Sequence, residues 1–175
     1  MVLKKITLIC ALVLSGSSFL FGQKTAYPAI VDDQLILTGD KCSWDANTVH
    51  TFSIVEANKD GYKYWGYYGL DYYEKDEHAR KGGLAFSNDL TNWVKYEYNP
   101  VILSNCRWPT VVISNGIFYM FYAEYNKVND SQIVRVESKN GIDFENKTVI
   151  VPYVSGEQNQ NPFIFFNKND SSYYL

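Results

Sequence analysis

The stretch "VISNGIFYMFYAEY" (residues 112–125) decides the fold of this protein. An apolar segment is followed by Asn115-Gly116 and then by a segment rich in aromatic residues. Asn-Gly is a strong signal for a two-residue β-hairpin, because both central positions of such a turn need a positive φ. The stretch therefore predicts two antiparallel strands joined by a tight turn.

The same pattern occurs twice more in the chain. "IVEANKDGYKYWGYYG" (54–69) turns at Asp60-Gly61, and "IFFNKNDSSYYL" (164–175) turns at Asn169-Asp170-Ser171. The turn residues Gly61, Gly116 and Ser171 are spaced 55 residues apart, and Tyr64, Tyr119 and Tyr174 fall in the same register. A fixed period of this length indicates a radial or stacked repeat architecture.

A second motif interleaves with these hairpins. "GLAFSNDLTNWVKYEYNPVI" (83–102) aligns with "IVRVESKNGIDFENKTVIVP" (133–152), so that Ser87 matches Ser138 and Trp93 matches Phe144, both 51 residues later. Each repeat therefore holds four antiparallel strands, which predicts an all-β fold, a β-propeller of four-stranded antiparallel blades. Aromatic residues on both faces of "FYMFYAEY" agree with blades packed on both sides by neighbours. The alternative, a β-sandwich, does not explain the long register.

The chain holds about two and a half such blades. The first is predicted over residues 44–103, the second over 106–153, and a third begins within 160–175. A propeller closes with about four or more blades, and the chain ends at "SSYYL", inside a predicted strand. We therefore expect this chain to be a fragment of a longer protein.

The N-terminus has the pattern of a secretory signal peptide over residues 1–22, followed by a partial propeller domain over 23–175. Lys4 and Lys5 precede the apolar core "ITLICALVL" and the small residues "SGSS", the order that a signal peptide requires. Nine apolar residues are too few to span a bilayer, although a retained anchor is the alternative. We predict a secreted or periplasmic protein without membrane contact after removal of the signal.

Composition excludes some partner and metal classes. The chain carries 16 Lys and Arg against 19 Asp and Glu, and it has no basic stripe of the kind that nucleic-acid binding needs. Cys42 and Cys106 remain after removal of the signal, either as a disulfide or as two separate buried thiols. Their spacing does not fit zinc, and His50 and His78 are the only histidines, so the residues predict no metal site.

Several segments resemble five-bladed β-propeller glycoside hydrolases. "GLAFSNDLTNW" (83–93) followed by "NPVI" (99–102) is similar to a recurring blade motif of family 43 arabinanases and xylosidases and of the related family 32 invertases. "WDANTVHTFSIVEANKDGYKYWGYYG" (44–69) resembles their first blade, and "RWPTVVISNGIFYMFYAEY" (107–125) resembles their second. The resemblance covers nearly all of the mature chain. It implies an axial pocket at the N-terminal ends of the innermost strands, where carbohydrate binds.

The resemblance also implies carboxylates in that pocket. Glycosidic cleavage needs one group to protonate the leaving oxygen and another to activate water or attack the anomeric carbon. Carried onto this sequence, the first-blade Asp-Pro of the family falls on Thr51-Phe52, and the third-blade Asp-Pro falls on Asn161-Pro162. The fourth blade, which supplies the general-acid Glu, would lie beyond residue 175. The residues predict no cofactor, and the resemblance alone allows calcium in the axial channel.

Two other acids are candidate catalytic groups. Asp45 follows Trp44 at the entry to the first inner strand, and Glu157 lies four residues before Asn161 in "EQNQNPF". The alternative for Asp45 is a capping or turn hydrogen bond. The alternative for Glu157 is an exposed loop carboxylate.

Five residues are candidate contacts of a sugar. Arg107 and Trp108 stand at the mouth of the second inner strand, where they would bind and stack a ring, although a propeller Trp is more often packed between blades. His50 would hydrogen-bond substrate, unless it is a satisfied interior histidine. Thr51 and Asn161 stand where the family has acids, and their hydroxyl and amide groups can hydrogen-bond a sugar.

Three functions agree with these residues. The first is an exported glycoside hydrolase, or part of one, acting on polysaccharides of the arabinan, xylan or fructan class. The second is a non-catalytic carbohydrate-binding propeller, and the third is an inactive fragment. A Glu in the fourth innermost strand would favour the enzyme.

Overall fold

The computed structural model describes residues 37–39, 44–45, 49–69, 80–103, 105–125 and 130–175. All of them belong to one unit, Leu35–Leu175. The secondary-structure elements in these ranges are all β-strands. These residues therefore contain no helix long and apolar enough to cross a membrane. The predicted signal peptide, Cys42 and His78 lie outside the described residues.

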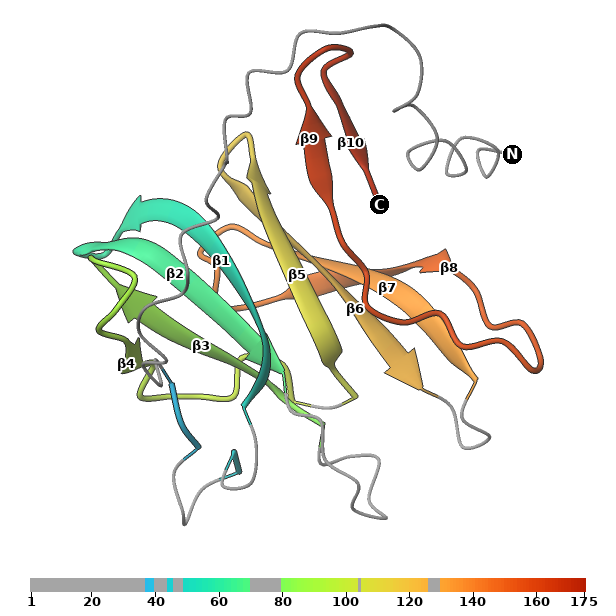
Figure 1. The fold of residues 1–175 in the computed structure, drawn as a ribbon, viewed down its shortest axis with the longest axis horizontal. Helices are drawn as coiled ribbons and strands as arrows, with labels where there is room; N and C mark the ends of the chain where they lie inside the picture. Colours follow the sequence, from blue (N-terminus) through green and yellow to red (C-terminus); the bar gives the residue numbers. More distant parts are fainter. Residues whose placement is uncertain (1–36, 40–43, 46–48, 70–79, 104, 126–129) are drawn as a thin grey trace, which may run out of the picture. The chain divides into compact units, whose positions relative to one another are not determined.

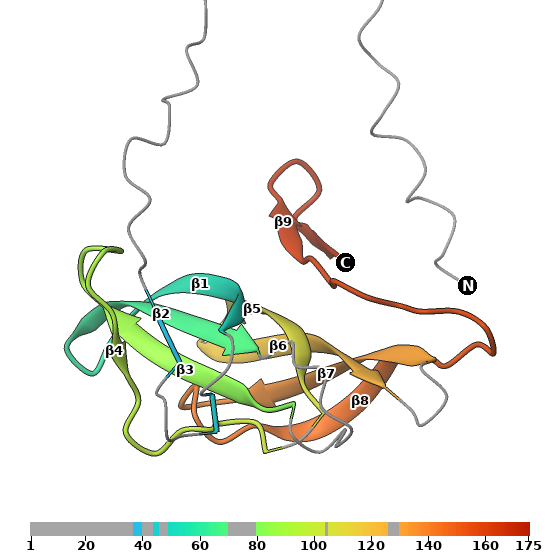
Figure 2. The same ribbon diagram turned by 60° about the horizontal axis from the view of Figure 1, so that its bottom comes forward.

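The strands form two sheets of identical order followed by a hairpin (Figure 1, Figure 2). The first sheet contains β1 (His50–Lys59), β2 (Tyr62–Gly69), β3 (Gly82–Ser87) and β4 (Val94–Lys95) in that order. The second contains β5 (Arg107–Ser114), β6 (Ile117–Tyr125), β7 (Ser131–Ser138) and β8 (Glu145–Val151). β9 (Phe165–Asn167) pairs with β10 (Ser172–Tyr174). All pairs are antiparallel between sequential strands, so the predicted four-strand repeat is confirmed.

The two complete β1–β2 and β5–β6 turns have the geometry predicted from their dipeptides. Asp60 and Gly61 have φ values of +53° and +82°, and Asn115 and Gly116 have values of +51° and +75°. Two successive positive φ values match the right-handed twist of the flanking strands and bring them into tight register. Local sequence alone therefore determines these hairpins.

The connections from β3 to β4 and from β7 to β8 use the same side-chain device. The hydroxyl oxygen of Ser87 accepts from the Leu90 N–H at 3.0 Å, and that of Ser138 accepts from the Gly141 N–H at 2.9 Å. Two residues after each serine, an acceptor side chain caps the following turn. Asp89 accepts from the backbone N–H groups of Thr91 and Asn92 at 2.8 and 2.7 Å, and Asn140 accepts from those of Ile142 and Asp143 at 2.9 Å each. This explains why Ser87 and Ser138 recur in the repeat.

Asp89, in the β3–β4 connection of the first sheet, should make the free energy of unfolding depend on acidic pH. The Asn92 backbone N–H, the Asn92 amide and the Thr91 N–H all hydrogen-bond the carboxylate and hold the pKa of Asp89 far below its ordinary value. A depressed folded-state pKa stabilises the fold above the unfolded value of about 3.9, and this contribution is lost as the pH falls below it. We expect Asp89→Asn to flatten the decline of the urea midpoint between pH 7 and pH 3. The reciprocal change Asn140→Asp should steepen it, and an unchanged slope in both variants would contradict this role.

The core lies between the two four-stranded sheets. Trp65 and Tyr67 of β2 pack against Phe118 of β6 with ring centroids 5.5 and 6.5 Å apart. The Tyr67 hydroxyl also donates to the Gly141 carbonyl oxygen of the second sheet at 2.8 Å. Each aromatic side chain buried in this way contributes about 1.5–3 kcal/mol. Cys106 belongs to the same core as a free, buried thiol whose burial raises its pKa.

The opposite face of the second sheet is also covered. Phe121 and Tyr125 of β6 form a second cluster, to which Ile164 and Leu175 of the third hairpin segment contribute. β6 is therefore buried on both faces, as its aromatic pattern predicted. The arrangement places the third segment against the second sheet.

Candidate functional site

The first strands of the two sheets lie side by side and start at the same end. The backbone N–H of Val111 in β5 donates to the Ser53 hydroxyl of β1 at 2.9 Å. Gly69, which pairs with His50 at the start of β1, faces both strand starts. A Cβ on Gly69 would lie 3.5 Å from the Thr51 hydroxyl oxygen and 3.4 Å from the backbone nitrogen of Trp108. The structure thus brings Thr51 and Trp108 together.

Three corresponding residues at this end have a left-handed backbone. Thr51, Trp108 and Asn161 have φ values of +46°, +49° and +50°, and they precede Phe52, Pro109 and Pro162. For a residue with a side chain this conformation costs about 1–2 kcal/mol. The strand pairing shifts at the first two positions, which is the pattern of a bulge that re-aims a side chain. Strained residues of this kind concentrate at functional sites.

An aromatic and cationic cluster surrounds Trp108. The Arg107 guanidinium lies 4.6 Å from the Trp108 ring centroid and 4.7 Å from that of Tyr125. The Arg80 guanidinium lies 5.2 Å from the Tyr125 ring on which Trp108 also packs, edge-on, at 5.9 Å. Asn105 fixes the Tyr125 backbone by accepting from its N–H at 3.1 Å and donating to its carbonyl oxygen at 2.7 Å.

Tyr125 and Arg80 were not among the residues predicted from the sequence. Tyr125 ends β6 and Arg80 precedes β3, far along the chain from Trp108. Antiparallel pairing places the end of β6 beside the start of β5. The last residue of the predicted aromatic strand was therefore the signal that would have found Tyr125.

The Thr51 hydroxyl lies at this end of the strands. Its oxygen is buried and has no hydrogen-bond partner among the residues that the structure describes. A buried hydroxyl without a partner costs about 1–3 kcal/mol, so a ligand or water that hydrogen-bonds it would be stabilised there. His50 and Asn161 are exposed at the same strand ends.

The segment that leads to Asn161 is fastened to the start of β7. The Ser131 hydroxyl donates to the Asn159 carbonyl oxygen at 2.8 Å, and the Asn159 amide donates to the Ser131 carbonyl oxygen at 3.0 Å. Ser131 also pairs with Gln158 in an isolated bridge. Glu157 is exposed and accepts from the Ser131 N–H through its backbone at 3.4 Å. The Glu157 carboxylate is therefore open to solvent near this end of the second sheet.

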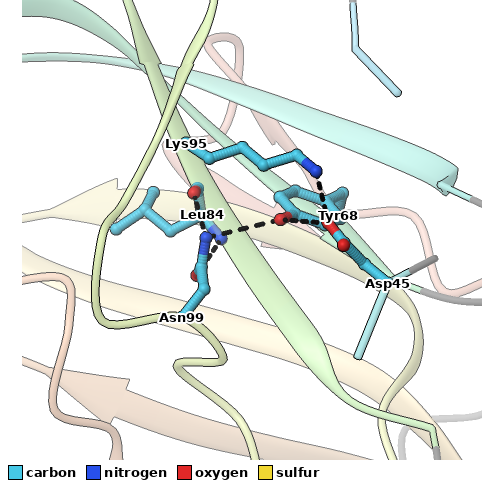
Figure 3. A network of polar contacts seen from close by, with 5 residues as sticks. All are labelled: Asp45, Tyr68, Leu84, Lys95 and Asn99. Carbon is cyan, nitrogen blue, oxygen red and sulfur yellow. Dashed lines mark hydrogen bonds and ion pairs between the residues drawn. The ribbon is translucent and has the colours of Figure 1, made fainter. Parts of the chain in front are cut away.

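Asp45 lies in a different environment (Figure 3). It is 1% exposed, and its carboxylate accepts from the Lys95 ammonium at 2.6 Å and from the Tyr68 hydroxyl at 3.2 Å. Lys95 belongs to β4, the last strand of the first sheet, whereas Thr51 and Trp108 stand at the first strands. The Asp45 carboxylate therefore links β2 to β4 and is not part of the Arg107–Trp108 cluster. Its catalytic role stays a prediction, as does that of Glu157.

No cluster of three or more His, Cys, Asp or Glu side chains suited to a metal ion occurs in the described ranges. Calcium in the axial channel, which the resemblance allows, stays a prediction. We derive no chemical step through it.

Comparison with known proteins relates the chain to glycoside hydrolases through its fold. No family model and no curated protein matches the sequence. The Bacillus subtilis arabinanase Arb43A superposes with a TM-score of 0.53 at 14% identity, over 73% of this chain and 47% of its own. A thermostable family-43 glycoside hydrolase gives 0.52 at 17% identity, over 71% and 39%. The GH32 β-fructofuranosidase of Bombyx mori gives 0.51 at 20% identity, over 62% and 24%.

These similarities confirm the predicted fold, because the matched proteins are β-propeller hydrolases of families 32 and 43. The chain spans between about a quarter and about half of the length of the structures it matches. The four-stranded units described above are propeller blades, and β1 and β5 are the innermost strands.

Proposed function

We propose that this protein is an exported, carbohydrate-active β-propeller that binds poly- or oligosaccharide at the N-terminal ends of its innermost strands. The observation that carries the proposal is the shared left-handed backbone of Thr51, Trp108 and Asn161 at that end. Three blades adopt a strained backbone at equivalent positions, which is expected where side chains must be aimed into a common site.

The side chains at this end suit a sugar. Trp108 packs in part against the Phe121–Tyr125 cluster and keeps part of its ring exposed, and the buried Arg107 guanidinium beside it carries several N–H donors. The Thr51 hydroxyl and the Asn161 amide both donate and accept. A sugar ring carries an apolar face and hydroxyl groups around its edge, so it would be bound by this combination.

Hydrolysis of an arabinan, xylan or fructan is the activity that we propose for the whole protein. It needs two carboxylic groups beside the glycosidic bond, and neither Thr51 nor Asn161 can exchange a proton in this role. Among the acids predicted from the sequence, Glu157 is the one whose side chain is exposed near the strand ends. Asp45 is buried and ion-paired with Lys95, which favours a structural role for it.

Non-catalytic carbohydrate binding is a second candidate function. A specific observation favours it, because the two described positions that match catalytic Asp-Pro pairs hold a hydroxyl and an amide instead. Such a propeller would still bind a carbohydrate in the pocket, but it would lack the groups that transfer protons during hydrolysis.

Trp108→Ala should weaken polysaccharide binding by about 10- to 100-fold, because truncating an aromatic residue on which a ligand packs costs about 1–3 kcal/mol of binding free energy. Affinity electrophoresis or calorimetry with arabinan, xylan and fructan would measure it on the full-length protein. Tyr64→Ala is the matched control, since Tyr64 is a partly exposed aromatic residue of β2 near the Asp60-Gly61 turn, at the opposite end of the strands. Equal affinity of Trp108→Ala and the unmodified protein would overturn the proposed binding site.

Glu157→Gln separates the enzyme from the binding protein. If Glu157 is a catalytic acid, turnover of aryl-glycosides and polysaccharides should fall at least about 100-fold while polysaccharide affinity is retained. Unchanged turnover would remove Glu157 from the mechanism. No turnover by the unmodified full-length protein, together with retained binding, would favour the non-catalytic function.

Export is proposed from the residue order in the first 22 positions. N-terminal sequencing of the protein recovered outside the cytoplasm should begin between residues 19 and 23. An intact Met1 on the recovered protein would contradict cleavage.

A further inference from the structure

We propose that a cavity beside Asp45 is a second binding site, separate from the strand ends, for one neutral sugar or polyol unit. The cavity has a volume of about 260 Å³ and is walled by Trp44, Tyr68 and Tyr96. Three charged groups, those of Asp45, Lys95 and Glu97, also line it. Ligand sites of proteins usually measure about 300–1,000 Å³, so a cavity just below this range suits at most a single ring.

The cavity opens on the face of the first sheet that is turned away from the second sheet. Tyr67 points toward the second sheet, where its hydroxyl donates to Gly141. Successive side chains of a strand point to opposite faces, so Tyr68 lines the other face. The Arg107–Trp108 cluster belongs to the second sheet and shares none of these wall residues.

The polar groups of the cavity are held in place before any ligand arrives. Tyr68 donates to Asp45 at 3.2 Å and accepts from the Asn99 amide at 3.3 Å. Asn99 is itself fixed by Leu84, whose N–H donates to it at 2.8 Å and whose carbonyl oxygen accepts from it at 2.7 Å (Figure 3). Preorganised groups reduce the entropic cost of binding.

The buried ion pair is a further reason to expect a ligand here. Asp45 is 1% exposed and the Lys95 side chain is 19% exposed. Moving such a pair out of water costs several kcal/mol per ion, and apolar residues of similar size are often equally stable or better. A buried pair on the wall of a cavity with aromatic walls supplies fixed polar groups of the kind that orient a bound ligand.

The charges at the wall indicate the class of ligand. Asp45 and Glu97 would repel an anion, whereas Lys95 would repel a cation. A neutral molecule with both donors and acceptors is compatible with both kinds of group, because it can donate to the exposed Glu97 carboxylate and accept from the Lys95 ammonium. Asp45 itself is already bonded to Lys95 and Tyr68. The flat Trp44 ring, stacked on Tyr68 with centroids 5.8 Å apart, favours a molecule with an apolar face. A pyranose, a furanose or a cyclic polyol has these properties.

The test is ligand-observed saturation-transfer NMR on the full-length protein with arabinose, xylose, fructose, glucose and myo-inositol. To isolate the second site, the experiment uses the Trp108→Ala variant, in which binding at the strand ends is weakened. We expect at least one neutral ring to bind this variant, and Trp44→Ala in the same background to weaken that binding at least about 10-fold. Glucuronate and glucosamine should bind less well than the matching neutral sugar.

Glu97→Gln tests the cavity without disturbing the fold, because Glu97 is exposed and glutamine has the same size as glutamate. The Glu97→Gln variant should bind the neutral sugar several-fold more weakly than the parent variant and should have the same thermal unfolding temperature. Absence of monosaccharide binding in Trp108→Ala, equal binding in the Trp44 and Glu97 variants, or a preference for glucuronate would each overturn the second site. The proposal does not depend on the strand-end site, whose failure would appear as unchanged polysaccharide binding in Trp108→Ala alone.

Discussion

Gly141→Ala is expected to destabilise the protein by about 3 kcal/mol or more, because backbone strain and a steric clash in the core act together. Gly141 has a φ of +80°, and a Cβ at this position would lie 2.7 Å from Trp65 Cζ3 and 3.0 Å from Phe118 Cε1. The left-handed backbone costs an alanine about 1–2 kcal/mol, and overpacking a well-filled core costs about 1–3 kcal/mol more. Because the carbonyl oxygen of Gly141 accepts from Tyr67, a shift of this turn also weakens the bond between the two sheets.

Urea unfolding at pH 7 measures this effect, and Gly116→Ala is the matched control. Gly116 has a similar φ of +75°, but its added Cβ would meet nothing within 4 Å. It should therefore show only the backbone cost of about 1–2 kcal/mol. Equal losses in the two variants would mean that the contact with the inter-sheet core carries no cost.

Lys95→Met is expected to cost about 3–5 kcal/mol, because it removes the Lys95 cation from the buried Asp45 carboxylate. The Lys95 ammonium lies 2.6 Å from Asp45, which is 1% exposed. Methionine keeps most of the length of the side chain, so the loss comes mainly from charge. Tyr68 still donates one hydrogen bond, which does not replace an ion pair.

A double-mutant cycle isolates this interaction. Asp45→Asn removes the buried charge, so Asp45→Asn with Lys95→Met should be more stable than Lys95→Met alone. Chemical unfolding of the four proteins at pH 7 yields the coupling energy. A cost below about 1 kcal/mol for Lys95→Met, with no recovery in the double variant, would show that the pair behaves like a surface ion pair.

The hairpins and the repeat could be predicted because their signals are local. Asp60-Gly61 and Asn115-Gly116 select a two-residue turn through their own backbone preferences. The 51-residue spacing of Ser87 and Ser138 reflects a capping bond that spans only three residues in each loop. Such features need no knowledge of distant contacts.

The candidate site could be predicted only in part. The resemblance to propeller glycoside hydrolases placed Thr51, Trp108 and Asn161 at the entries of the innermost strands, and the structure gives all three a left-handed backbone. Asparagine adopts a positive φ more readily than most residues, but nothing in the residue types of Thr51 and Trp108 signals one. The conformation follows from how each innermost strand enters its sheet.

By itself, the sequence determined the strand order within each blade, the turn types and the blade boundaries of this protein, because strand alternation and turn preference act over a few residues. Only the tertiary structure decided the partners of the charged and polar side chains. Asp45 meets Lys95 across 50 residues of chain, and Arg80 meets Tyr125 across 45. Such contacts depend on how strands from different parts of the chain are brought side by side, and a carboxylate or guanidinium carries no local preference that would identify its partner in advance.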